Sequence, residues 1–158
     1  MKIETRSAGG MLQVGEGRTL SGIAVPYGSL SHVLHDRARP YRERFQRGAL
    51  AHMESTILLY GHDMSGVPLA SVRGSTLSFS ETEAGLSFSA TLPESRPDIR
   101  EALQRGDLDG SVSIGFVAEE DTWQNRTNPS VRTVRRAKLH ELSIVLSGAY
   151  PKATGVFK

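Results

Sequence analysis

The sequence has no cysteine, and this absence removes several kinds of chemistry. It excludes thiol nucleophiles, thiolate metal sites, dithiol redox motifs and disulfide bonds. At 158 residues, the chain is long enough to bury about two-thirds of the surface that its unfolded form exposes. The sequence therefore predicts a single domain, residues 1–158, that is stabilised by a hydrophobic core without disulfide bonds.

Long hydrophobic runs are also missing. The longest apolar stretch is residues 57–60, far short of the ~20 residues that a membrane-spanning helix needs. Residues 1–17 are polar and rich in glycine, so they lack the apolar core of a signal peptide. We therefore expect a soluble protein that is not exported.

No charge of one sign dominates, because the formal net charge is only +2. The densest basic cluster is "RTVRRAK", residues 132–138. It could serve a nucleic-acid-binding barrel, but it lacks the interleaved aromatic residues that such surfaces use, so we do not expect nucleic acid as a partner. The alternative interpretation is a solvated edge strand whose charges discourage pairing with another sheet.

Several well-known site motifs are absent as well. The sequence contains no G-x-S-x-G elbow and no lysine-bearing phosphate loop. In "HVLHD", His32, His35 and Asp36 could share a metal ion, but no further ligands are placed to complete a tetrahedral set. We predict neither a metal site nor a cofactor.

What the sequence does contain is a series of short alternating segments typical of strands. We expect strands at residues 19–25 and 57–60, a meander over residues 67–93, and strands around residues 114–117 and 138–148. These patterns predict a mainly β (α+β) fold, a closed or nearly closed antiparallel β-barrel with a few flanking helices.

Helix signals are fewer. Ser95 is a candidate N-cap, Pro97 and Asp98 suit a first turn, and Gly106 is a suitable stop, so we expect a helix between Ser95 and Gly106. A second helix is expected to start near Gly48 and to run through "ALAHMES". The polar segments 32–40 and 124–130 are expected to be a loop and a hairpin tip.

Two serines and one histidine stand out as candidates for chemistry. In "DGSVSIGF", Ser111 and Ser113 alternate along a strand, so both face either the core or the outside. A serine nucleophile needs a base, and His62 follows the apolar strand "ILLYG", where a rigid element could present it to a cleft. Alternation alone leaves open a second reading, in which both serines face solvent and Gly115 marks a bulge.

Several motifs, taken in order, resemble those of the tailed-phage prohead maturation proteases, serine peptidases related in fold to herpesvirus assemblin. The resemblance covers residues 22–153, nearly the whole chain, and single motifs such as "GHD" are less specific than the ordered set. The motifs are "GIAVPYG", "ERFQRGAL", "LLYGHD", "PLASV", "EAGLSFSATLP", "LQRGDLDGSVSIGF" and "LHELSIVLSGAYPKA".

The resemblance implies roles for particular residues. His62 matches the catalytic histidine and Ser113 the nucleophile, while the third member would be Glu141 or, because assemblin uses a second histidine nearby, His140. In a regular strand these two neighbours face opposite sides, so only one could serve the site.

The same resemblance predicts how the surroundings of the nucleophile are used. Ser111 would line the substrate cleft as a small neighbour, and Gly115 would let the substrate backbone approach. The arginine pair that follows the third triad residue in assemblins has no equivalent, since Arg135 and Arg136 precede Glu141. The oxyanion donors are therefore not assigned.

The implied activity is that of a serine endopeptidase inside an assembling phage or phage-like prohead in the host cytoplasm. It would cleave the scaffold segment and the N-terminal extension of the major capsid protein, and also itself. It would need no cofactor, and a homodimer or a higher oligomer could control it. The rival hypothesis is a non-catalytic β-barrel that serves capsid assembly as a scaffold.

Overall fold

The computed structural model describes residues 2–8, 12–37, 39–146 and 156–157, with strands and one short helix. The motif "AYPKA" at residues 149–153, part of the sequence resemblance, lies outside these residues. Within the described part of the chain, no helix has the length and apolar character needed to cross a membrane.

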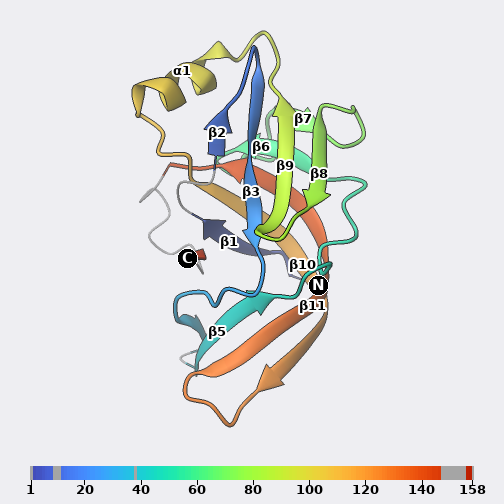
Figure 1. Cartoon of the computed structure of the whole chain (residues 1–158), viewed down its shortest axis with the longest axis vertical. Helices are drawn as coiled ribbons and strands as arrows, with labels where there is room; N and C mark the ends of the chain where they lie inside the picture. Colours follow the sequence, from blue (N-terminus) through green and yellow to red (C-terminus); the bar gives the residue numbers. More distant parts are fainter. Residues whose placement is uncertain (1, 9–11, 38, 147–155, 158) are drawn as a thin grey trace.

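The larger sheet is built around a long antiparallel hairpin of β10 and β11, whose tip is the predicted turn at residues 124–130 (Figure 1). The strand order is β12, β1, β10, β11, β5 and β4, and β6 pairs with both β11 and β7. These strands are β1 (Glu4–Ala8), β4 (Leu34–Asp36), β5 (Arg39–Phe45), β6 (Ile57–Tyr60), β7 (Ala70–Ser71), β10 (Val112–Gln124), β11 (Ser130–Ile144) and β12 (Val156–Phe157).

The smaller sheet has the order β2, β3, β9 and β8, and all its pairs are antiparallel. It contains the predicted strand near residues 19–25 and the later part of the predicted meander, whereas β7 at the start of the meander belongs to the larger sheet. Its strands are β2 (Leu12–Val14), β3 (Thr19–Pro26), β8 (Leu77–Glu81) and β9 (Gly85–Thr91).

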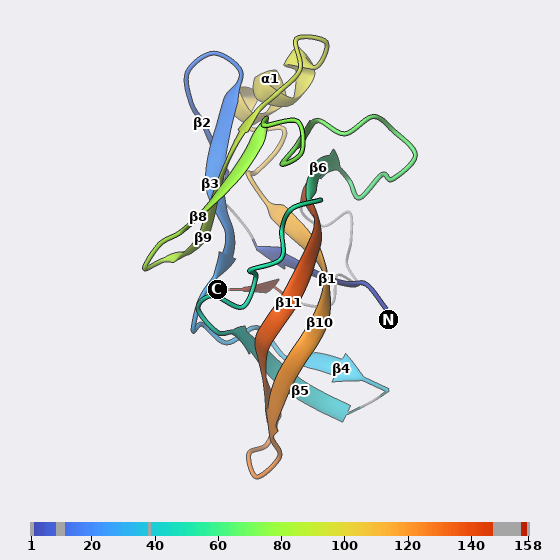
Figure 2. The same cartoon turned by 90° about the vertical axis from the view of Figure 1, so that its right-hand side faces the viewer.

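The expectation of a closed barrel is not supported. Over the described residues, the edge strands β2 and β8 of the smaller sheet pair with no strand of the larger one. The smaller sheet lies to one side of the β10–β11 hairpin (Figure 2). Alternating apolar residues fix which face of a strand is buried, but they do not fix whether the edges of two sheets join. The fold is mainly β, with two separate sheets.

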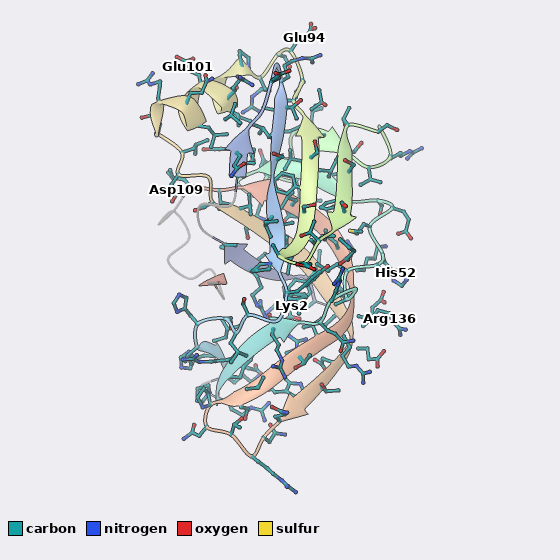
Figure 3. The ribbon with its side chains drawn as sticks, viewed as in Figure 1. Lys2, His52, Glu94, Glu101, Asp109 and Arg136 are labelled. Atoms are coloured by element: carbon teal, nitrogen blue, oxygen red, sulfur yellow. The ribbon has the colours of Figure 1, made fainter. Side chains whose placement is uncertain are left out.

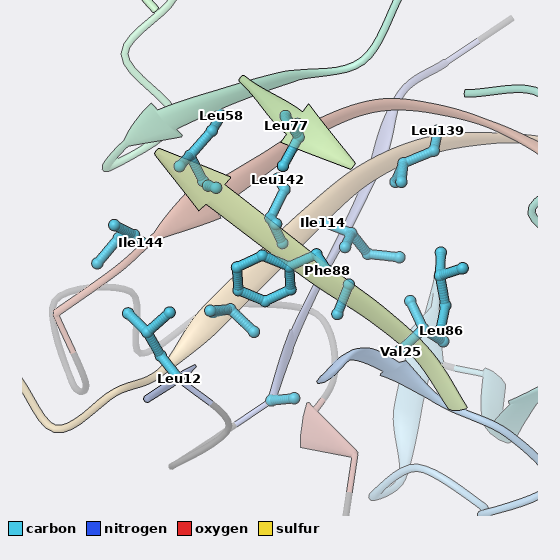
Figure 4. Packing of buried hydrophobic residues seen from close by; sticks show 14 of the residues in the cluster. Leu12, Val25, Leu58, Leu77, Leu86, Phe88, Ile114, Leu139, Leu142 and Ile144 are labelled. Carbon is cyan, nitrogen blue, oxygen red and sulfur yellow. The ribbon is translucent and has the colours of Figure 1, made fainter. Parts of the chain in front are cut away.

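One hydrophobic cluster joins the two sheets. Leu86 and Phe88 of β9 pack in the same cluster as Ile114 of β10 and Leu142 of β11 (Figure 4). All four side chains are almost completely buried. Because successive residues of a strand point to opposite faces, the neighbours of Ile114 and Leu142 face away from this core. The candidate site residues lie on that other face.

The predicted helix is present as α1 (Pro97–Arg105), at one end of the molecule (Figure 1). Gly106 ends it in the left-handed conformation with φ 82°, as expected for a C-cap glycine. The N-cap, however, is Arg96 rather than Ser95, and it makes no side-chain capping hydrogen bond.

The second predicted helix is wrong. Residues 48–55 form an irregular segment that runs alongside β11. The Ala49 carbonyl accepts from the Ala137 N–H (2.8 Å), and the His52 carbonyl accepts from the Leu139 N–H (3.0 Å). Hydrogen bonds to a neighbouring strand replace the helical ones. Residues 32–40 also differ from the predicted loop, because they contain β4 and the start of β5.

The basic run at residues 132–138 is not on an edge strand, because β11 has partners on both sides. Arg132 is buried and pairs with Glu4 (2.8 Å), Glu43 (3.0 Å) and Asp121 (2.7 Å). Only the later arginines of the run are exposed: Arg136 lies at the periphery (Figure 3) and pairs with a glutamate of β10. The predicted solvated edge strand is therefore wrong.

Burial and pairing both act on the charges of this cluster. Glu43 is fully buried and bound by Arg6 Nε at 2.7 Å as well as by Arg132. Burial raises the pKa of Glu4, but the hydrogen bonds and the charges of Arg132 and Arg6 outweigh it, so that the pKa lies below its ordinary value. These ion pairs connect β1, β5, β10 and β11.

Candidate active site

Ser113 lies on the face of β10 that is turned away from the core. In the register of the sheet it is opposite Ser143 of β11 on one side and Ser7 of β1 on the other. Its neighbours Val112 and Ile114 point into the core, as alternation predicts. Ser113 is only 1% exposed, so the reading in which it faces open solvent is wrong.

Ser111 precedes the strand and is held by backbone contacts. Its N–H donates to Asp109 Oδ1 (2.9 Å), and its carbonyl accepts from the Val145 N–H (3.1 Å). It is 5% exposed. Its part in a substrate cleft stays a prediction.

His62 is presented by a tight turn at the end of β6. Gly61 and His62 both have positive φ angles (62° and 60°), and the Asp63 N–H donates to the Tyr60 carbonyl (3.1 Å). Two central residues with positive φ are the pattern of a type I′ turn, in which glycine is favoured and other residues are strained. A non-glycine residue in this conformation costs about 1–2 kcal/mol, so the surrounding contacts must hold His62 there.

The imidazole of His62 joins the other two predicted residues. Its Nε2 lies 2.9 Å from Ser113 Oγ, and its Nδ1 is in hydrogen-bond contact with Glu141 Oε1. An ionised Glu141 can only accept, so Nδ1 carries the proton and the lone pair of Nε2 faces the Ser113 hydroxyl. The side chain of His62 is 20% exposed and that of Glu141 is 8% exposed. Residues far apart in the sequence thus form one connected chain of contacts.

Of the two candidates for the third position, Glu141 is the one that contacts His62. The regular alternation expected at this point is interrupted, because Gly115 pairs with Glu141 while the next residue of β10, Phe116, pairs with Leu139. This β-bulge leaves His140 as the extra residue between two paired positions.

Ser143 was missed by the sequence reasoning, although it is fully buried beside the site. Its hydroxyl donates to Glu141 Oε2 (2.6 Å) and accepts from the backbone N–H of His62 (3.1 Å). One side chain therefore contacts both the carboxylate and the strained turn. The signal was available, because Glu141 and Ser143 are two residues apart in a strand and so share a face.

Gly115 makes room for Glu141. A Cβ atom at position 115 would lie 2.7 Å from Glu141 Oε1 and 2.9 Å from its Cγ, closer than real atoms approach. The strand register is consistent with this, since Gly115 is directly opposite Glu141. The carboxylate, rather than a substrate backbone, occupies the space that the glycine leaves.

Asp63, the acidic residue of "GHD", is engaged elsewhere. Its Oδ1 accepts from the Ser65 hydroxyl (2.6 Å) and the Ser65 N–H (2.9 Å). These hydrogen bonds hold the pKa of Asp63 below its ordinary value. In the described ranges of the chain, no three acidic or histidine side chains gather closely enough to hold a metal ion.

A buried serine, a histidine on a tight turn and a carboxylate in one hydrogen-bonded chain form the constellation used by serine hydrolases. Residues 2–156 match the sequence profile of the caudovirus prohead serine proteases, and the chain belongs to this family. Neither curated proteins nor solved structures gave a match. The family supports a serine peptidase role in capsid maturation, with capsid protein as the associated partner and the assembling capsid as the location.

Proposed function

We propose that the chain is a serine endopeptidase in which Ser113 is the nucleophile, His62 the general base and Glu141 the residue that orients His62. The observation that carries this proposal is the continuous contact from Ser113 Oγ through both imidazole nitrogens to the Glu141 carboxylate. Family membership over residues 2–156 supports the same reaction class.

The reaction follows from this geometry. His62 Nε2 takes the hydroxyl proton while Ser113 Oγ attacks the scissile carbonyl carbon, which gives a tetrahedral oxyanion. His62 then gives that proton to the leaving amine, the C–N bond breaks and an ester to Ser113 remains. Water enters, gives a proton to His62 and attacks the ester carbonyl. Return of the proton to Ser113 Oγ releases the carboxylic acid and restores the enzyme.

Glu141 acts on His62 without touching the substrate. It fixes the protonated Nδ1 and stabilises the imidazolium that forms in each step. Ser143 acts as a positioning residue, because it holds the second carboxylate oxygen and the backbone of His62 at the same time. Gly115 provides the space that the carboxylate needs.

The substrates that we propose are the scaffold segment and the N-terminal extension of the major capsid protein, together with the protease itself. The site needs no cofactor for this reaction, since the general base and the nucleophile are both supplied by the chain. Ser111 lines the approach to the nucleophile in this proposal.

Co-expression with the capsid protein of the same phage tests this proposal. We expect intact mass spectrometry to find a trimmed capsid protein with wild-type protease and an untrimmed one with Ser113→Ala. The control is Ser89→Ala, which removes an exposed serine of β9 and should leave trimming unchanged. Equal trimming with Ser113→Ala, or assembled capsids without any trimming by the wild type, would contradict it and favour the non-catalytic assembly factor.

A further inference from the structure

A pocket of about 510 Å³ lies beside His62, between the segment that follows β6 and the segment that precedes α1. Gly61 and Asp63, the two neighbours of His62 in the chain, are part of its wall. The apolar part of the wall is formed by Leu59, Tyr60, Val67, Pro68, Leu69 and Pro93.

The register of the larger sheet relates this pocket to the nucleophile. Ser113 is opposite Ser143, and Ser143 is opposite Leu59, so the three residues form one row on the same face of the sheet. Two strand spacings amount to roughly 10 Å. An extended peptide advances about 3.3 Å per residue. A peptide that runs along this row from Ser113 therefore reaches the pocket roughly three residues from the scissile bond.

The wall has apolar groups available for a ligand, while its charged groups already have partners. Val67 is 89% exposed and Tyr60 is 40% exposed, although both are apolar or largely so. Asp63 is bound by Ser65, and Arg96 by Asp98 at 3.0 Å. Exposed apolar side chains gathered beside a reactive site are typical of ligand-binding surfaces.

We infer that this pocket is a substrate subsite, which takes an apolar side chain of the cleaved peptide about three residues from the scissile bond. The inference rests on the proposed peptidase function and adds to it a preference for an apolar side chain in the substrate. Burial of the apolar side chain against Val67 and Tyr60 provides the selectivity, because removing apolar surface from water is favourable.

A mixture of peptides from a digested bacterial proteome is the probe, and mass spectrometry maps the new cleavage sites. The wild type should show a preference for apolar residues two to four positions from the cut. The variant Val67→Asp should cleave those peptides about tenfold less well and should shift the preference towards lysine and arginine. Its matched control is Val33→Asp, since Val33 is 41% exposed and lies outside the pocket wall.

The outcomes separate this inference from the proposal beneath it. Cleavage without an apolar preference at those positions, or a preference that Val67→Asp leaves unchanged, would overturn the subsite alone. So would a change of oligomeric state in Val67→Asp with unaltered specificity, because the pocket would then hold a second copy of the chain. Absence of all cleavage by the wild type would contradict the peptidase function itself.

Discussion

The substitution Ser143→Ala removes one hydroxyl and, with it, two contacts of the candidate triad. The Glu141 carboxylate loses the donor at its Oε2, and the His62 N–H loses its acceptor. Ser143 is fully buried and lies on the strand that carries Glu141, so we expect it to make no contact with substrate. We therefore expect kcat to fall while KM changes little.

The size of the effect follows from the kind of contact that is lost. Hydrogen bonds to charged groups contribute about 1.5–3 kcal/mol, and a factor of ten in rate corresponds to about 1.4 kcal/mol. If this free energy is lost from the transition state, in which the imidazolium of His62 forms, kcat falls by a factor of about 10 to 150. The substitution also removes one contact that holds the turn, whose left-handed conformation costs about 1–2 kcal/mol.

Steady-state kinetics on a peptide that spans a mapped capsid-protein cleavage site provides the assay. The matched control is Thr56→Val, because Thr56 Oγ1 also donates from a buried position to β11, at the Leu139 carbonyl (2.7 Å), but does not touch the triad. The control should lose about 1 kcal/mol of stability and keep its kcat. A kcat for Ser143→Ala within twofold of the wild type, or an equal fall in Thr56→Val, would refute the positioning role.

Three further predictions follow. Gly115→Ala should push the Glu141 carboxylate aside and lower kcat at least tenfold, as steady-state kinetics on the same peptide would show; an unchanged kcat would mean that the carboxylate can move without loss. Glu43→Leu removes a fully buried carboxylate and leaves Glu4 and Asp121 as the remaining acidic partners of Arg6 and Arg132, so it should cost about 3 kcal/mol in urea unfolding, whereas a loss below about 1 kcal/mol would contradict the buried cluster. The pKa of Glu4 is lower in the folded protein than in the unfolded chain. The ionised Glu4 side chain therefore stabilises the fold above its ordinary pKa of 4.5, and this stabilisation is lost as the pH falls through the pKa of Glu4 in the folded protein. Urea titrations between pH 7 and pH 3 should therefore show a smaller loss in Glu4→Gln than in the wild type, and equal losses would contradict the assignment.

The sequence predicted the individual elements better than their assembly. Strand alternation placed Ile114 in the core and Ser113 on the other face, and Gly106 ended the helix as expected. The predictions of a closed barrel and of a helix at residues 48–55 were wrong because both outcomes depend on hydrogen bonds between segments far apart in the sequence. Local apolar patterns do not show which strand edges pair with each other.

The candidate site shows the same division. His62 and Ser113 were predicted from ordered motifs, and the structure brings their side chains within 2.9 Å of each other. The choice between Glu141 and His140 depended on the register of β11 against β10, which places Glu141 opposite Gly115 and so on the face of Ser113, and the sequence pattern does not reveal this register. The reason for a glycine at position 115 is the Glu141 side chain on the neighbouring strand, and this partner is known only once the register is known.

The most direct test of the central claim is the mass of the protease after exposure to a fluorophosphonate. We expect a covalent adduct on the wild type, located by peptide mapping at Ser113, with no adduct at this position in Ser113→Ala and much slower labelling in His62→Ala. An adduct on a different serine, or no adduct on a preparation that trims capsid protein, would contradict Ser113 as the nucleophile.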